Sequence, residues 1–115
     1  MMETKITQML GIQYPIIGGT MMWISNADFV AAISNAGGMG VLASAMYDSR
    51  ESFADAIDRI KELTDKPFAV NINLFPAMRQ MDNEVYMSVL EEKAVKIVET
   101  SGHSAPEELC RRFKQ

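Results

Sequence analysis

The stretch Phe68-Ala-Val-Asn-Ile-Asn-Leu74 indicates most clearly how this chain folds. Its apolar residues follow one another almost without a break, as in strands buried inside a parallel sheet that is covered on both faces. Asn71 and Asn73 interrupt the run two residues apart, so both side chains lie on the same face of the strand. We therefore predict a buried strand over residues 68–74 with two amide groups on one face.

Three further apolar runs, over residues 15–17, 40–44 and 94–98, repeat this pattern along the chain. The centres of the runs lie near Ile16, Leu42, Val70 and Ile97, about 27 residues apart, which is the length of a strand, a helix and their loops. An amphipathic stretch follows each run, over residues 27–36, 48–63, 83–93 and 104–113, and a loop passes through Pro76. The pattern predicts four βα units in one parallel sheet with right-handed crossovers.

Helix start signals support three of these stretches. Asn26 is a favourable N-cap for the first helix. The second and fourth helices each begin with a pair at capping-box spacing, Asp48 with Glu51 and Ser104 with Glu107.

The number of units predicts half of a closed barrel. A complete (β/α)₈ barrel needs about 250 residues, and this chain has 115. We therefore expect an α/β fold in which residues 1–115 form one domain, the first four βα units of a (β/α)₈ TIM barrel, with the chain cut inside its fourth helix. Open strand edges and an uncovered inner face, carrying Ile16, Leu42, Val70 and Ile97, would then favour self-association.

Composition narrows the functional classes. The chain carries 11 Lys and Arg against 15 Asp and Glu, a net charge of −4, which gives it no general attraction for nucleic acid. No apolar run approaches the roughly 20 residues that cross a bilayer. The single cysteine excludes an intrachain disulfide, and one His with one Cys cannot form a metal site of the usual kind. We expect a cytoplasmic protein with no metal, no nucleic-acid partner and no membrane partner.

Two positions allow a ligand-binding interpretation and a structural one. Gly18-Gly19-Thr20 follows the first strand, where glycines let the backbone approach a flat ligand or simply make a turn. Asn71 needs hydrogen-bond partners inside an apolar strand, and a heteroaromatic ligand or a neighbouring loop can supply them.

Two other features point more weakly to chemistry. Met21, Met22 and Trp23 form an apolar cluster that packs in the core or an interface, or contacts a flat ring. His103 follows the fourth strand at the end of the sheet where barrel active sites form. It is a candidate proton acceptor, although a solvated loop residue is the more common case. On these grounds we assign no catalytic residue.

Three segments of the chain match a known family. Ile6-Thr-Gln-Met-Leu-Gly-Ile-Gln-Tyr-Pro-Ile-Ile-Gly-Gly-Thr-Met21, Ser34-Asn-Ala-Gly-Gly-Met-Gly40 and Leu63-Thr-Asp-Lys-Pro-Phe-Ala-Val-Asn-Ile72 resemble the N-terminal half of nitronate monooxygenases, formerly called 2-nitropropane dioxygenases. The flavin-dependent enoyl-acyl-carrier-protein reductases are similar over the same segments. The resemblance implies an FMN-dependent barrel enzyme with the flavin across the carboxyl ends of the strands.

The resemblance also implies which residues meet the flavin. These are Gly19, Thr20, Met21 and Met22 in the turn after the first strand, and Asn71 in the third. Thr20 departs from the Gly-Gly-Met run that is common in the reductases. The phosphate-binding loops and the catalytic histidine of the family lie later in the barrel than this chain extends. We therefore expect weak FMN binding and no turnover by these 115 residues alone.

The implied reaction oxidises an alkyl nitronate with molecular oxygen to a carbonyl compound and nitrite. The alternatives are an FMN-dependent reductase of enoyl thioesters and a non-catalytic, flavin-binding or purely structural half-barrel. An open flavodoxin-like sheet is a further alternative, in which residues 18–25 would have to form the phosphate loop.

Overall fold

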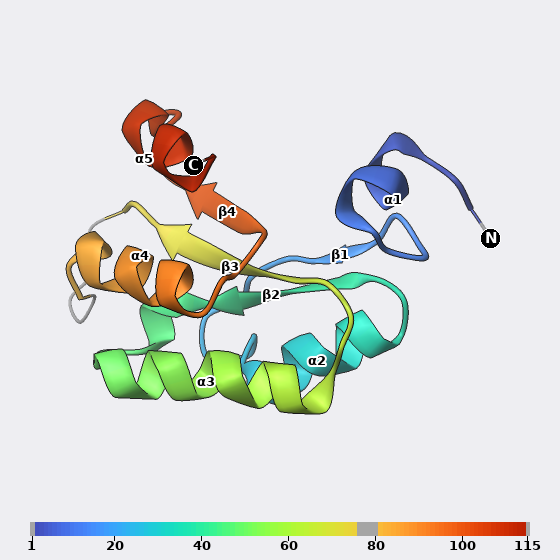
Figure 1. Cartoon of the computed structure of the whole chain (residues 1–115), viewed down its shortest axis with the longest axis horizontal. Helices are drawn as coiled ribbons and strands as arrows, with labels where there is room; N and C mark the ends of the chain where they lie inside the picture. The colour runs from blue at the N-terminus through green and yellow to red at the C-terminus, as the bar shows by residue number, and fades with distance from the viewer. Residues whose placement is uncertain (1, 76–80, 115) are drawn as a thin grey trace.

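The computed structural model describes residues 2–75 and 81–114, so the loop predicted through Pro76 lies outside the described residues. Four parallel strands form one sheet in the order β1-β2-β3-β4, which are Ile17–Gly18, Met39–Ala43, Phe68–Asn73 and Val98–Ser101. The sheet curls into half of a barrel (Figure 1). This confirms the prediction of four βα units that form the first half of a TIM barrel.

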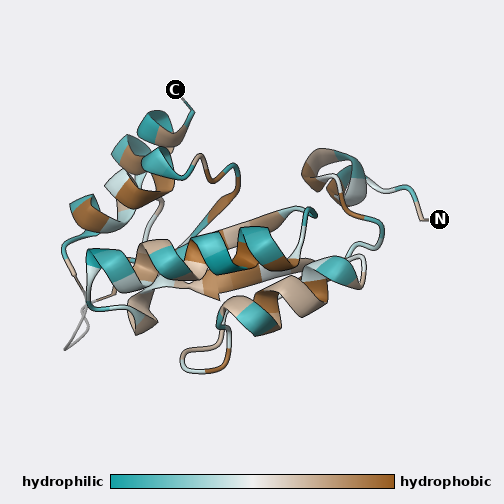
Figure 2. Ribbon diagram, turned by 60° about the horizontal axis from the view of Figure 1, so that its bottom comes forward, coloured by the Kyte–Doolittle hydropathy of each residue, from teal (hydrophilic) through white to brown (hydrophobic). Residues whose placement is uncertain are grey.

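Helices alternate with the strands, as the apolar pattern predicts. They are α1 (Lys5–Leu10), α2 (Ala27–Asn35), α3 (Arg50–Leu63), α4 (Asn83–Glu92) and α5 (Glu107–Phe113), with a short 3₁₀ turn, η1, at Ser44–Met46. Figure 2 shows predominantly apolar strands behind helices that carry many hydrophilic residues. Among the described residues, no helix combines the length and the apolar character that a membrane crossing requires.

Side-chain caps explain where several helices begin, and two of the predicted caps are wrong. Asn26 caps α2 through Phe29 N–H, as predicted. The cap of α3 is Ser49, whose hydroxyl oxygen accepts from Ser52 N–H, and not the predicted Asp48 with Glu51. A capping box at Ser104 is also wrong, because α5 begins at Glu107 after Pro106 and has no side-chain cap.

Helix α1 was not predicted from the sequence, although its N-terminal signal is present. The Thr4 hydroxyl oxygen accepts from Thr7 N–H at 3.1 Å, and the Thr7 hydroxyl oxygen accepts from Thr4 N–H at 2.8 Å. This is a capping box with threonine in place of the usual Glu or Gln. Gly11, at φ 70°, ends the helix in the left-handed region.

The main core lies between the sheet and helices α2, α3 and α4. Leu42 and Val70 belong to it and are fully buried, together with Phe53, Ile57 and Tyr86 from the helices. The expectation that Leu42 and Val70 face the inside of the barrel is therefore wrong. Side chains alternate along a strand, so their neighbours one position earlier occupy the inner face.

The N-terminal segment of the chain covers the part of that inner face near the amino ends of the strands. Val41 and Ala69 are fully buried in a second cluster with Ile12 and Met39, against which Leu10 and Ile97 also pack. Segment 10–12 therefore lies across the amino-terminal part of the inner face. The carboxyl-terminal part carries polar residues instead.

The fourth strand lies later in the chain than predicted. The apolar run over residues 94–98 predicts a strand there, but Ala94 has φ 53° and turns the chain after α4. Val95 packs into the main core and Ile97 into the inner cluster, which explains why the run is apolar. The strand itself is Val98–Ser101, paired in register from Val70↔Val98 to Asn73↔Ser101. Glu99 and Ser101, which lie beyond the predicted strand, therefore belong to the sheet.

Candidate functional site

A cavity of about 230 Å³ lies at the carboxyl ends of the strands, the end where (β/α)₈ barrels carry their active sites. We call it the mouth cavity. Its lining comes from the loop after β1, from the ends of β2, β3 and β4, and from η1: Thr20, Met22, Ala43, Ala45, Asn71, Asn73, Glu99 and Ser101. Thr20, Met22 and Asn71, which the resemblance placed at a flavin, thus line one cavity.

The two glycines after β1 have different roles. A Cβ on Gly18 would overlap with Ile33 Cδ1 of α2, so Gly18 makes room for this side chain to pack on the strand. A Cβ on Gly19 would have no atom within 4 Å. Gly19 therefore leaves open space that a ligand can approach, and the packing of the described residues does not require it.

The loop after Gly19 is held by its own hydrogen bonds. Met21 N–H donates to the buried Ser25 hydroxyl at 2.8 Å, and Ser25 N–H donates to Met21 O at 2.8 Å. Trp23 takes a left-handed φ of 70°, and its N–H contacts Met46 Sδ. Met21, Met22 and Trp23 are all exposed, so packing in the core is not their role in this chain.

Thr20 places a polar atom inside the mouth cavity wall. Its Oγ1 is buried and has no hydrogen-bond partner within the described part of the chain. Leaving a buried hydroxyl without a partner costs free energy, about 1–3 kcal/mol in typical cases. A ligand in the mouth cavity is one group that can supply the missing bond.

Asn71 has partners on the neighbouring strand. Its Nδ2 donates to Glu99 Oε1 at 2.7 Å, and Ser101 Oγ donates to its Oδ1 at 3.4 Å. Asn71 is buried, whereas Glu99 is exposed. Sequence reasoning missed Glu99 and Ser101, although their alternation with Val98 and Thr100 is a strand signal.

His103 lies near the same end of the sheet but does not line the mouth cavity. Its ring packs edge-on against Phe75, with centroids 4.6 Å apart, and the residue is exposed. No group of three or more His, Cys, Asp or Glu side chains in residues 2–75 and 81–114 is arranged to hold a metal ion.

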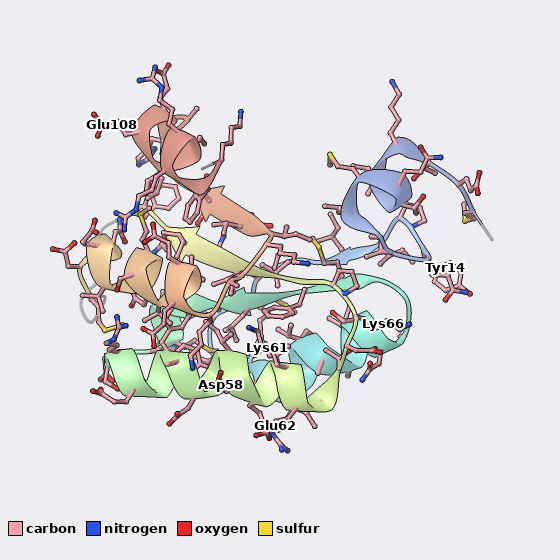
Figure 3. All side chains as sticks on the ribbon, in the orientation of Figure 1. Tyr14, Asp58, Lys61, Glu62, Lys66 and Glu108 are labelled. Atoms are coloured by element: carbon pink, nitrogen blue, oxygen red, sulfur yellow. The ribbon has the colours of Figure 1, made fainter. Side chains whose placement is uncertain are left out.

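Two larger cavities lie at the opposite end of the sheet, near the amino ends of the strands. They measure about 450 and 630 Å³ and share Lys66 and Pro67, just before β3 (Figure 3). By volume alone, these two cavities would be chosen as the candidate active site. We choose the mouth cavity instead, because the residues that perform chemistry in barrels lie at the carboxyl ends of the strands.

Comparison with known proteins agrees with this architecture. A "Probable nitronate monooxygenase" of Staphylococcus aureus is 33% identical over 109 residues, which is 84% of this chain and 30% of that protein. A hydroxy-methyl-oxo-octahydro-indene-carboxyl-CoA dehydrogenase of Mycobacterium tuberculosis is 44% identical over 71 residues, 62% of this chain and 20% of that protein.

Solved structures show the same fold. FabK from Thermotoga maritima superposes with a TM-score of 0.86 at 32% identity, over 99% of this chain and 35% of that one. Nitroalkane oxidase from Streptomyces ansochromogenes superposes with a TM-score of 0.81 at 21% identity, over 96% of this chain and 40% of that one. The chain thus spans well under half the length of these matched proteins.

The family profile described as nitronate monooxygenase matches residues 3–113, almost the whole sequence. The half-barrel and the quoted segments therefore have one common explanation. This chain belongs to the nitronate monooxygenase family of oxidoreductases.

Proposed function

We propose that this chain provides one wall of the FMN site of an oxidoreductase that converts alkyl nitronates, with molecular oxygen, to carbonyl compounds and nitrite. The observation that supports this most strongly is the mouth cavity, where Thr20, Met22 and Asn71 come together beside the open space at Gly19. We further propose that the protein is cytoplasmic and that the chain associates with itself.

The residues fit the flat, polar-edged ring of a flavin. Gly19 leaves room for close approach of a ring to the backbone, and Met21 and Met22 are exposed beside it. The Thr20 hydroxyl and the Asn71 amide supply hydrogen-bonding groups of the kind that a ring with donors and acceptors requires. A purely apolar ligand would leave the Thr20 hydroxyl without a partner.

A bound flavin supplies the electron transfer between the nitronate and oxygen. The described residues of this chain orient the ring and cover part of it. We assign no base to them, because His103 packs on Phe75 and does not line the mouth cavity.

A second candidate function has a specific observation in its favour. The Mycobacterium tuberculosis relative, at 44% identity, is named as a carboxyl-CoA dehydrogenase, so it acts on a CoA thioester. A reductase or dehydrogenase of enoyl or related thioesters, using the same flavin, is the alternative. A non-catalytic, flavin-binding or structural half-barrel is the alternative of another class.

A titration with FMN tests the cofactor assignment. We expect the chain to bind FMN with a dissociation constant well above micromolar, because the mouth cavity offers contacts to the ring and few to a phosphate. Gly19→Val should weaken binding about tenfold, corresponding to ~1.4 kcal/mol, because its side chain fills the open space. Flavin fluorescence measures both values.

The matched control is Ala32→Val, which adds bulk at an exposed position on α2. It should bind FMN as the wild type does, and both variants should keep the wild-type melting temperature. Equal FMN binding by Gly19→Val and wild type would place the flavin elsewhere. Propyl-2-nitronate added to the chain with oxidised FMN, and crotonyl-CoA added without oxygen to the chain with chemically reduced FMN, then separate the substrate classes. We expect binding of the nitronate to shift the flavin spectrum without turnover, and crotonyl-CoA to leave the reduced flavin unchanged.

A further inference from the structure

Asn71 on β3 and Glu99 on β4 make a close polar side-chain contact in the lining of the mouth cavity. The two residues are register partners on neighbouring strands, so their side chains emerge side by side on the same face of the sheet. Asn71 Nδ2 donates to Glu99 Oε1 at 2.7 Å, whereas the contact of its Oδ1 with Ser101 Oγ is longer, at 3.4 Å.

Glu99 determines which way the Asn71 amide points. An ionised carboxylate only accepts hydrogen bonds, so it holds the amide nitrogen and repels the amide oxygen. The Ser101 hydroxyl both donates and accepts, so it can bond either end of the amide. A rotation of the amide by 180° would place Oδ1 against the carboxylate, and this is the orientation that Glu99 excludes.

Glu99 has no other evident structural task. No Lys, Arg or His among the described residues forms an ion pair with it, although seven such pairs are present elsewhere. The residue is exposed and lies on β4, where one edge of the four-stranded sheet ends. The side chain of Glu99 bonds the buried Asn71 amide in the cavity wall. Orienting that amide explains why an exposed carboxylate lies at this position.

We propose that Glu99 is a positioning residue: it fixes the Asn71 amide so that a ligand in the mouth cavity meets a defined donor and a defined acceptor. The identity of that ligand as FMN rests on the proposed function. The orientation itself does not, because it rests on the contact between Asn71 and Glu99 alone.

The ligand-free chain tests the orientation directly. In a nitrogen–proton correlation spectrum, the Asn71 side-chain amide is assigned by its disappearance in Asn71→Ala. Glu99→Met removes the acceptor at nearly constant shape, and should shift that signal and speed its exchange with water. Glu99→Gln keeps an acceptor oxygen, so it should restore much of the wild-type signal. Glu108→Gln on α5 (Figure 3) removes a charge outside the cavity lining and should leave the signal unchanged.

FMN affinity then tests the consequence. Glu99→Met should weaken FMN binding about tenfold relative to Glu99→Gln, the effect expected for one well-placed hydrogen bond to a ligand. Both variants lack the charge, so their difference isolates the acceptor. In the Asn71→Ala background, the change from Gln to Met at position 99 should have no further effect, because Glu99 acts through Asn71.

The outcomes separate the two proposals. If the wild-type chain shows no FMN binding at any concentration while the amide signal shifts as expected, the flavin assignment fails and the positioning role stands. If FMN binds but Glu99→Met leaves both the amide signal and the affinity at the Glu99→Gln level, the positioning role is wrong. The same conclusion follows if Glu99→Met weakens FMN binding equally with and without Asn71.

Discussion

The purified chain is expected to associate with itself, and light scattering should give a mass of two or more copies that rises with concentration. The sheet ends at β1 on one side and at β4 on the other, so each of these strands has one edge without a neighbour in the described structure. Closed barrels leave no such edges, since the first and last strands pair. Two copies facing each other could pair each β4 with the partner's β1.

Exposed apolar side chains around β1 strengthen this expectation. Within the described residues, six consecutive or nearly consecutive large apolar side chains are between 44% and 69% exposed: Ile16, Ile17, Met21, Met22, Trp23 and Ile24. Soluble monomers rarely expose a contiguous apolar surface of more than a few hundred Å². A net charge of −4 helps solubility but does not cover this surface.

Ile17→Lys should shift the chain toward monomer, because it places a charge on the exposed edge strand. Leu63→Lys is the matched control, since Leu63 is 36% exposed at the end of α3, a helix that packs on the main core, and it should associate as the wild type does. A wild-type chain that stays monomeric at hundreds of micromolar and melts sharply would show that the half-barrel is self-sufficient.

Gly40→Ala should destabilise the fold more than any other single-carbon addition at the described glycines. A Cβ at Gly40 would lie 2.7 Å from Val30 Cα and closer still to Val30 O, so the obstacle is the backbone of α2. Helix α2 also reaches β2 at this point through Gly40 N–H, which donates to Ser34 Oγ at 3.1 Å. We expect a loss of about 3 kcal/mol, the upper part of the range for an overpacked core.

The melting temperature should accordingly fall by roughly 10–20 °C for a domain of this size. Gly19→Ala provides the control, since its Cβ meets no atom within 4 Å, and its stability should stay within about 0.5 kcal/mol of the wild type. Equal melting temperatures for the two variants would mean that α2 does not pack on β2 as closely as described.

The sequence predicts the fold largely because its apolar runs are evenly spaced and alternate with amphipathic stretches. The prediction is wrong where an apolar run packs into the core without forming a strand. Residues 94–98 carry Val95 and Ile97 because these pack against the main core and the inner cluster, and β4 begins only at Val98. Periodicity within a short run does not distinguish a strand from a buried turn that precedes one.

The candidate site is predicted in part, through the residues that interrupt apolar segments. Asn71 is conspicuous in its strand, and the glycines after β1 are conspicuous in sequence. Glu99 is not, because an exposed glutamate is common and its importance comes from lying opposite Asn71 in the register. The different roles of Gly18 and Gly19 likewise depend on where Ile33 points, which no pattern in the sequence states.

The measurement that tests the central claim most directly is a titration of the isotope-labelled chain with FMN, followed residue by residue by NMR. The account predicts that the signals of Gly19, Met22, Asn71 and Ser101 move together as FMN saturates the mouth cavity. The signals of Gly37 and Lys66, beside the larger cavities at the amino ends of the strands, should stay in place. Shifts confined to Gly37 and Lys66, or no shift at any of these residues at millimolar FMN, would contradict the assignment of the mouth cavity as a flavin site.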